Sequence, residues 1–325
     1  MRIVSGIRPS GDLHIGNYLG AIKQWVLLQQ KGDCFFFIAD LHAITTPFDP
    51  KKLKENIFDT LATYLACGLS PKKSTIFLQS LVKEHTELAW ILSVFTPYGD
   101  LKRMTQFKEK SKQYPESVNA GLFNYPVLMA ADILIYKADF VPVGRDQSQH
   151  LELAREIARK FNKKFGNIFK EPKPIFSEGE KIMSLTNPLQ KMSKTSDPNS
   201  CIFLDDTPEK IKEKIMKAVT DSGREIIYSP SKKPGISNLL KIFSLFSGKK
   251  INELEKEFEG KGYEEFKRKV AELLILKLKE IRERKFENLK RKNLLEKILK
   301  EGSKKAQKEA QKTLKEVKKK IGFLV

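Results

Sequence analysis

The sequence predicts an α/β protein in which a doubly wound parallel sheet is followed by an appended α-helical domain. Two observations carry this prediction. Over the first 145 residues, short apolar runs alternate with amphipathic segments, as they do where parallel strands are joined by helices. Beyond residue 207 the apolar residues recur only at helical steps. The length of 325 residues exceeds what one hydrophobic core usually serves, so we expect more than one domain.

The individual elements follow from the spacing of the apolar residues. A strand is expected at 2–7 and a helix at 15–30, separated by a turn that contains Pro9 and Gly11. The other strands are expected at 34–39, 74–78 and 139–143, and the other helices at 50–67, 84–95, 120–136 and 146–161. Folds of this kind bind ligands at the carboxyl ends of the strands.

A change of composition marks the end of the sheet region. Residues 171–200 are rich in proline and serine, and Thr207 with Pro208 then forms the start signal of a helix. We therefore expect a sheet domain at 1–206, a helical domain at 207–290 and C-terminal helices at 291–325 that pack back toward the first domain. The lysine-rich stretch 304–320 keeps apolar residues at helical steps, which indicates an amphipathic helix.

Charge and cysteine content limit the class of protein. The net charge is +20, and residues 201–325 hold 33 Lys and Arg against 20 Asp and Glu. Such a surface favours a nucleic-acid partner, although a solvated Lys/Glu helix surface is the alternative. No apolar stretch approaches the roughly 20 residues of a membrane span, and no secretory signal precedes the first strand, so a cytoplasmic location is expected. The three cysteines lack metal-site spacing, and we predict no metal site.

A first candidate motif lies where the first strand gives way to a helix. Arg8, Pro9 and Ser10 form the turn, and His14-Ile15-Gly16-Asn17 opens the helix. Exposed N–H groups at such a terminus suit an anionic phosphate, and Gly16 would let a nucleotide approach the backbone. Taken alone, a turn with glycine and proline is more often only a turn.

A second candidate motif lies in the loop-rich stretch. Lys191-Met192-Ser193-Lys194-Thr195 places two lysines three residues apart with hydroxyl groups beside them. Lysine binds phosphate as a point charge, and a mobile loop can bring it onto developing pyrophosphate charge. The alternative is a solvated basic loop.

Together, the two motifs resemble the HIGH and KMSKS signatures of class I aminoacyl-tRNA synthetases. Further blocks at 40–45, 103–110, 128–134, 141–147, 218–222 and 234–240 resemble bacterial-type tryptophanyl-tRNA synthetases. The resemblance covers nearly the whole chain. It implies a Rossmann-like catalytic domain at 1–206, an anticodon-binding domain at 207–290, and a homodimer with helices near 84–136 at its interface.

The resemblance also implies the ligands and the residues that bind them. ATP, with Mg²⁺ carried on it, L-tryptophan and tRNA(Trp) are the expected substrates and partners. The residues implied in the reaction are His14, Asn17, Lys110, Lys191 and Lys194. Those implied in ATP binding are Arg8, Pro9, Ser10, Gly16, Asn17, Gly144, Arg145, Asp146, Ile182, Lys191, Met192, Ser193, Lys194 and Thr195. Those implied in tryptophan binding are Asp132, Met129, His42, Tyr125, Gln147, Val141, Val143 and Val4.

Asp132 has a chemical reason to contact the substrate. It stands in an otherwise apolar helical run, where a buried unpaired carboxylate would be costly; the alternative is a position on the helix surface. An indole N–H only donates and a carboxylate only accepts, so Asp132 is expected to bind the indole. Two departures from the family pattern are Arg8, where glutamine is more common, and one extra residue after Lys194.

The expected reaction is that of a ligase that forms a carbon–oxygen bond. The tryptophan carboxylate attacks the α-phosphorus of ATP, pyrophosphate leaves, and the acyl group passes to tRNA with release of AMP. The nearest alternative is a tyrosyl-tRNA synthetase, because a phenol O–H could also donate to Asp132. A paralogue that binds tRNA without charging it and another nucleotidyltransferase of the same fold are the remaining alternatives.

Overall fold

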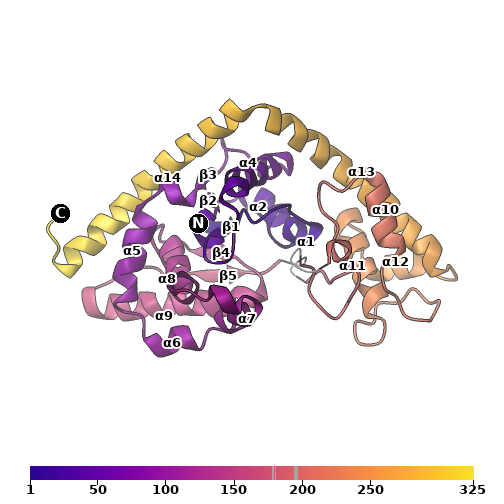
Figure 1. Cartoon of the computed structure of the whole chain (residues 1–325), viewed down its shortest axis with the longest axis horizontal. Coiled ribbons are helices and arrows are strands. Elements are labelled where there is room, and N and C mark those ends of the chain that lie inside the picture. The colour runs from indigo at the N-terminus through magenta and orange to yellow at the C-terminus, as the bar shows by residue number, and fades with distance from the viewer. Residues whose placement is uncertain (178, 180, 194–196) are drawn as a thin grey trace. The chain divides into compact units, whose positions relative to one another are not determined.

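The computed structural model describes residues 1–177, 179, 181–193 and 197–325. The chain divides into two compact units (Figure 1). Unit 1 comprises Met1–Gly11, Gln24–Phe176 and Asn288–Val325, and unit 2 comprises Asp12–Lys23 and Ser177–Glu287. These units are defined by contacts between residues, so their bounds differ from the segments expected at 1–206, 207–290 and 291–325. The functional roles expected for those three segments stay a prediction.

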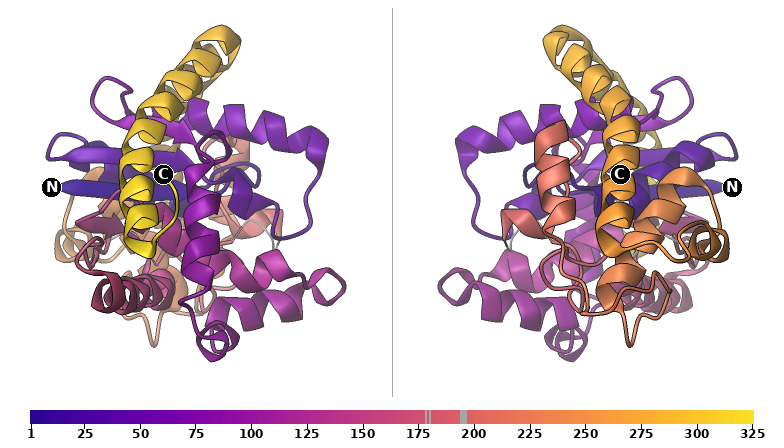
Figure 2. Two further views of the ribbon diagram at one scale, coloured as in Figure 1. Left: turned by 90° about the vertical axis from the view of Figure 1, so that its left-hand side faces the viewer. Right: turned by 90° about the vertical axis from the view of Figure 1, so that its right-hand side faces the viewer.

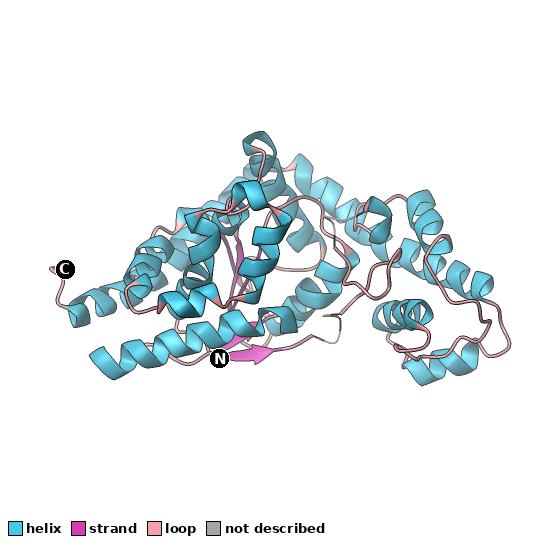
Figure 3. Cartoon of the chain, turned by 60° about the horizontal axis from the view of Figure 1, so that its bottom comes forward, coloured by secondary structure: helices cyan, strands magenta, loops and turns pink. Residues whose placement is uncertain are grey.

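Unit 1 is built on a five-stranded parallel sheet with the strand order β3-β2-β1-β4-β5. The strands, magenta in Figure 3, are β1 (Arg2–Ile7), β2 (Asp33–Ile38), β3 (Thr75–Leu78), β4 (Phe140–Pro142) and β5 (Lys173–Ile175). This order confirms the predicted doubly wound fold. β5 was not predicted. It contains Pro174 and lies at the sheet edge, where a missing N–H breaks no ladder bond.

Helices cover both faces of this sheet (Figure 1). On one side lie α2 (Lys23–Leu28) and α4 (Pro50–Ala66), and on the other lie α5 (Glu84–Ser93) and α8 (Ala120–Leu134). Alternation along β2 explains the packing. The Phe36 ring stacks on Trp25 of α2 at 4.7 Å, while the neighbouring Phe35 stacks on Tyr136, just beyond α8, at 4.7 Å. A strand buried on both faces has to be apolar throughout.

The remaining elements of unit 1 are mostly short. The helices at Tyr98–Lys102 (α6) and Thr105–Gln113 (α7) were not expected from the sequence; α7 is polar and buries none of its residues. The other elements are α3 (Asp40–Ala43), η2 (Gln79–Leu81), α6 (Tyr98–Lys102), α7 (Thr105–Gln113), η3 (Pro115–Ser117), η4 (Arg145–Gln147), α9 (Ser148–Phe165) and α14 (Lys292–Ile321).

The long C-terminal helix α14 packs along β3 (Figure 2), and its presence confirms the helix expected at 304–320. Gly302 makes the close approach possible, because a Cβ there would lie 1.8 Å from the carbonyl oxygen of Ile76. The Leu78 N–H donates to Ser303 Oγ at 3.3 Å. The helix thereby covers a strand at the sheet edge, whose exposed backbone groups could otherwise pair with another chain.

Unit 2 is helical. The expected start signal is confirmed, since Thr207 caps α10 by accepting a hydrogen bond from the Lys210 N–H. The rings of Phe243, Phe258 and Phe266 form the centre of the unit. Its elements are α1 (Ile15–Asn17), the π-helical η1 (Tyr18–Ile22), η5 (Pro198–Ser200), α10 (Pro208–Met216), α11 (Pro234–Ser247), α12 (Ile251–Glu257) and α13 (Tyr263–Lys290), whose last three residues belong to unit 1. Within the described parts of the chain, no helix is long and apolar enough to cross a membrane.

Candidate active site

The strand order predicts a ligand-binding crevice at the carboxyl ends of β1 and β4. The chain passes from β1 outward through β2 and β3, and then returns to the other side of β1 as β4. Such a reversal leaves a crevice at the carboxyl ends of the two strands. Arg8 directly follows β1, and Val143 and Gly144 follow β4. The Ser5 hydroxyl donates to the Pro142 carbonyl at 2.9 Å and ties the two strand ends together.

Two cations of unit 1 act on each other at this edge. Burial lowers the pKa of Arg8, while the nearby Tyr125 and Tyr114 act in the opposite direction. Burial and the Arg8 guanidinium lower the pKa of Lys110 to about 8, opposed by Glu109. Two like charges held near each other and partly removed from water favour an anion between them. The predicted phosphate role of Arg8 and Lys110 is consistent with this arrangement.

If Lys110 binds phosphate as predicted, its lowered pKa should make ATP binding sensitive to pH. An ammonium group binds phosphate and a neutral amine does not, so the KM for ATP is expected to rise as the pH increases through about 8. Measurement of this KM from about pH 7 to pH 9.5 checks the prediction. In Lys110→Arg the rise should disappear, because a guanidinium keeps its proton over this range. A rise of equal size in Lys110→Arg would assign the effect to another group.

Asp132 of α8 is a buried carboxylate held by three side chains. It is 1% exposed and contacts three nitrogen atoms: Gln79 Nε2 at 2.7 Å and His85 Nδ1 at 2.5 Å, both at Oδ1, and His42 Nε2 at 2.7 Å, at Oδ2. Burial opposes ionisation, but hydrogen bonds from His42 and His85 prevail and lower the pKa of Asp132 to about 2. The group is therefore a carboxylate at neutral pH, able only to accept hydrogen bonds.

One acceptor position of Asp132 is left by this arrangement. Each carboxylate oxygen can accept two hydrogen bonds. Oδ1 already accepts two, whereas Oδ2 contacts only His42 among the described residues. An indole N–H approaching from the His42 side would complete the set. The alternative of a surface aspartate is wrong, because Asp132 is buried.

Tyr125 lies next to His42 and is in turn paired with His150. The Tyr125 ring meets the His42 ring edge-on at 6.1 Å, and the Tyr125 hydroxyl lies 2.7 Å from His150 Nε2. Burial and the nearby His42 lower the pKa of His150 to about 4, against Asp146. His150 is therefore neutral at physiological pH. Its buried Nδ1 has no hydrogen-bond partner in the described part of the protein.

The other residues implied in tryptophan binding lie in the same unit. Val4 of β1 and Val141 of β4 are buried in its core, and the half-buried Met129 and Val143 pack against that core. Gln147 ends η4, where its Nε2 donates to Asp146 Oδ2 at 2.9 Å. Of these four aliphatic residues, only Met129 and Val143 keep part of their surface exposed.

The remaining residues of this edge that were implied in ATP binding occupy two turns. After Arg8, Pro9 is buried and Ser10 exposed. Gly144 precedes η4, and the Arg145 guanidinium lies 4.8 Å from the centre of the Phe176 ring.

The His14 motif lies in unit 2, where it caps its own helix. The Gly16 N–H donates to His14 Nδ1 at 3.1 Å, and the His14 N–H donates to Asn17 Oδ1 at 3.1 Å. A Cβ on Gly16 would lie 2.8 Å from the His14 ring, so a larger residue there would displace that ring. The same Cβ position lies 3.9 Å from Ile182, which brings this third residue next to the motif.

Unit 2 also holds the described part of the second motif. The Met192 N–H donates to the Ile182 carbonyl at 2.9 Å, and the Ile15 N–H donates to the Ile202 carbonyl at 2.9 Å. The Ser200 hydroxyl donates to the Ser193 carbonyl at 3.2 Å. Backbone pairing thus links both motifs to one framework. Lys191 is described and exposed, whereas Lys194 and Thr195 lie outside the described residues.

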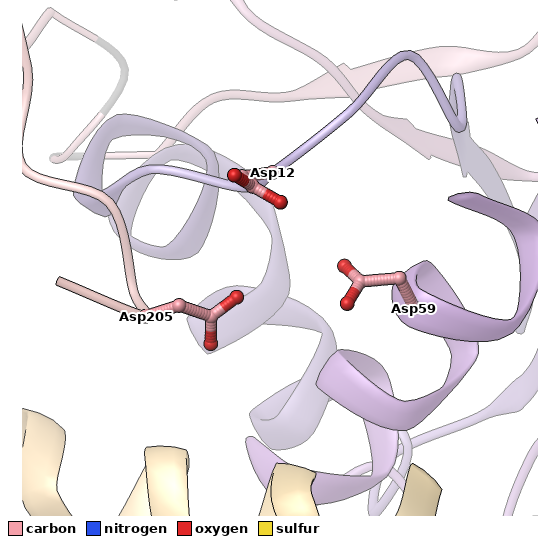
Figure 4. A group of neighbouring side chains, drawn as sticks. All are labelled: Asp12, Asp59 and Asp205. Atoms are coloured by element: carbon pink, nitrogen blue, oxygen red, sulfur yellow. The ribbon is translucent and has the colours of Figure 1, made fainter. Parts of the chain in front are cut away.

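Two acidic residues accompany the His14 motif in unit 2. Asp12 and Asp205 have carboxylate oxygens within 4.8 Å of each other and point toward one another in Figure 4, which also labels Asp59 of unit 1. Asp205 is paired with Lys285. Because exposed acidic groups of this kind are common without an ion, we assign no metal to them.

Four polar residues were not predicted as site residues from the sequence: Gln79 and His85, which contact Asp132, Tyr136, which contacts His85, and His150, which contacts Tyr125. One signal was present. The chain contains four histidines, and three of them, His42, His85 and His150, gather near Asp132 or Tyr125 in unit 1. Histidine is scarce here, so its occurrence in apolar helical segments could have marked the site.

Comparison with known proteins gives a consistent result. The family described as tRNA synthetases class I (W and Y) matches residues 1–279. A tryptophan–tRNA ligase of Caldanaerobacter subterraneus subsp. tengcongensis is 54% identical over all of this chain and 99% of its own length.

Solved structures agree over the whole length. A tryptophanyl-tRNA synthetase of Mycoplasma pneumoniae matches with a TM-score of 0.93 and 37% identity, covering 99% of this chain and 98% of its own. A tryptophanyl-tRNA synthetase of Campylobacter jejuni, complexed with ADP and tryptophan, matches with a TM-score of 0.82 and 42% identity. That match covers 99% of this chain and 100% of the other.

Proposed function

The chain belongs to the class I tRNA synthetases for tryptophan and tyrosine, and we propose on this basis that it is a tryptophan–tRNA ligase. It activates L-tryptophan with ATP and transfers the amino acid to tRNA(Trp). The observation that carries the amino-acid site is the buried Asp132 carboxylate, held ionised with one acceptor position left at Oδ2, where an aromatic side chain with a single donor can bind. The relationship to tryptophan–tRNA ligases at 54% identity supports the choice of tryptophan.

The reaction needs positioning and charge stabilisation rather than a protein nucleophile. The tryptophan carboxylate attacks the α-phosphorus of ATP, and pyrophosphate leaves with the electrons of the broken P–O bond. A ribose hydroxyl at the tRNA end then attacks the acyl carbon and releases AMP. Asp132 fixes the indole, and Arg8 and Lys110 stabilise phosphate charge. Mg²⁺ arrives with ATP as part of the substrate.

Unit 2 supplies further residues for ATP and tRNA in this proposal. His14, Gly16, Asn17 and Lys191 act on the phosphates, and helices α10 to α13 bind the anticodon arm. The excess of basic over acidic residues in 201–325 supports a polyanionic partner. A cytoplasmic location, where tRNA is charged, completes the proposal.

Charging of tRNA tests this function against a paralogue that only binds tRNA. Purified protein with ATP, Mg²⁺ and labelled tryptophan should convert tRNA(Trp) to its aminoacylated form, and tRNA(Tyr) with tyrosine should stay uncharged. Binding of tRNA(Trp) without any aminoacyl product would instead support the binding-only alternative. Charging with tyrosine would support the tyrosyl alternative.

We also propose a homodimer formed through the α5–α6 face of unit 1. Three large apolar side chains are strongly exposed there: Trp90 at 74%, Val94 at 71% and Tyr98 at 69%. Trp90 and Val94 are four residues apart and therefore lie on one side of the helix. Large apolar side chains exposed to this extent in neighbouring helices mark an interaction surface.

Charged substitutions on this face are expected to separate the dimer. The double variant Trp90→Glu/Val94→Glu should sediment as a species of 37.3 kDa, whereas the parent chain should sediment at about 75 kDa, twice that mass. Leu276→Glu is the matched control, because Leu276 is 66% exposed on α13 in unit 2, and it should stay dimeric. Unchanged sedimentation of the double variant would place the interface elsewhere.

A further inference from the structure

A chain of buried polar groups extends from Asp132 into the core of unit 1. His85 of α5 contacts Asp132 Oδ1 through Nδ1 at 2.5 Å and the Tyr136 hydroxyl through Nε2 at 2.7 Å. Tyr136 stands four residues after Asp132. All three side chains are buried. The Phe77 ring packs against both His85 and Tyr136, at 5.9 and 5.7 Å.

The direction of the hydrogen bonds follows from the chemistry of the two ends. Burial, with the charges of Asp132 and Glu84, raises the pKa of Tyr136 well above its ordinary value, so the phenol keeps its proton. The Asp132 carboxylate can only accept. His85 must therefore donate from Nδ1. An imidazole that donates from one nitrogen accepts at the other in its neutral form, and Nε2 then accepts from the Tyr136 hydroxyl. The chain of donation runs from Tyr136 through His85 to Asp132.

A second donor to the same oxygen is oriented by the backbone. Gln79 Oε1 accepts the Leu41 N–H at 3.2 Å, which turns the amide so that Nε2 donates to Asp132 Oδ1 at 2.7 Å. His85 and Gln79 together fill the acceptor capacity of Oδ1. The plane of the carboxylate is then fixed, and Oδ2 faces His42.

We propose that Tyr136 and His85 are positioning residues that hold Asp132 so that Oδ2 selects a substrate ring carrying an N–H donor. The inference rests on the proposed function, in which Asp132 accepts the indole N–H. A fixed acceptor that cannot rotate or gain a proton penalises a ring without a donor, because the acceptor is then left buried and unpaired. A carboxylate that could rotate would find other partners, and it would then discriminate less against a ring without an N–H group.

The test compares tryptophan with benzothienylalanine, in which sulfur replaces the indole N–H group. The ratio of kcat/KM for the two amino acids in ATP–pyrophosphate exchange measures selection for the N–H. In His85→Leu this ratio should fall about 10-fold to 100-fold while the KM for ATP is unchanged. His85→Asn should restore most of the ratio, because its amide can donate from nearly the position of Nδ1. Tyr136→Phe, which removes one hydroxyl, should give a smaller fall and a folded protein.

Two controls keep the outcome unambiguous. Phe77→Leu disturbs the packing around both rings without touching a hydrogen bond, and it should lower thermal stability but keep the ratio. Asp132→Ala tests the underlying function. If Asp132→Ala lowers the ratio while His85→Leu and Tyr136→Phe do not, the positioning role is overturned and the function stands. If Asp132→Ala also leaves the ratio unchanged, the indole contact itself is wrong, and the inference is overturned with it.

Discussion

Replacement of Asp132 by alanine is expected to raise the KM for tryptophan about 100-fold or more, with little change in the KM for ATP. The variant removes the acceptor for the indole N–H and leaves the N–H groups of His42, His85 and Gln79 without their partner. Both effects concern Asp132 and the groups that contact it, where tryptophan is expected to bind, so the KM for tryptophan should change and the KM for ATP should not. The measurement is ATP–pyrophosphate exchange with each substrate varied in turn.

A matched control lies at the other end of the sheet. Asp139 precedes β4 and bonds Lys170 and the Arg2 N–H, at the amino end of the strand rather than its carboxyl end. Asp139→Ala should therefore leave the KM for tryptophan unchanged. Equal losses for tryptophan and ATP in Asp132→Ala would argue against an indole contact and for a general structural role.

Replacement of Lys110 by methionine is expected to lower kcat/KM for ATP by about 100-fold to 1,000-fold. Methionine keeps much of the length and apolar stem of lysine but carries no charge. Since the charge of Lys110 is held close to Arg8 and partly buried, one of two cations that stabilise developing phosphate charge would be lost. The loss should appear at all pH values below about 8 and should be measured in the first half-reaction.

Lys108→Met provides the comparison on the same helix. Lys108 is exposed, and its loss should change kcat/KM for ATP less than about 3-fold. If Lys108→Met and Lys110→Met have the same effect, the general positive charge of α7, rather than the position of Lys110, assists ATP.

The sheet could be predicted because strands that are buried on both faces appear in the sequence as continuous apolar runs. β2 is apolar at every position from Cys34 to Ile38, as a strand covered on both faces must be. β5 left no such record, because it is three residues long and contains Pro174. α7 was missed for a related reason: it buries nothing, so its apolar spacing carries no helical signal.

The grouping of the chain into units could not be read from periodicity. Residues 13–15 belong with 202–204 because their backbones pair, although the two segments lie far apart in the sequence. Backbone hydrogen bonds between loop residues depend on no particular side chains. The turn at Arg8 and the helix that begins at Ile15 are neighbours in sequence, yet they fall in different units.

The candidate site was predictable where chemistry is concentrated in one residue. Asp132 stood out as a single carboxylate in an apolar helix, and Arg8 and Lys110 stood out through the resemblance. The partners of Asp132 were not predictable, because Gln79 of η2 and His85 of α5 come from other elements and meet it only in the folded protein. Because Gln79 and His85 both donate to Oδ1, the Asp132 carboxylate has a fixed orientation. The sequence alone indicated only that Asp132 could accept a hydrogen bond.

The most direct test of the account is the amino acid that supports ATP–pyrophosphate exchange. The purified protein with ATP and Mg²⁺ should exchange labelled pyrophosphate when tryptophan is present, and exchange with tyrosine should be lower by a factor of about 1,000 or more. No exchange with tryptophan, or equal exchange with tyrosine, would contradict the proposed reaction.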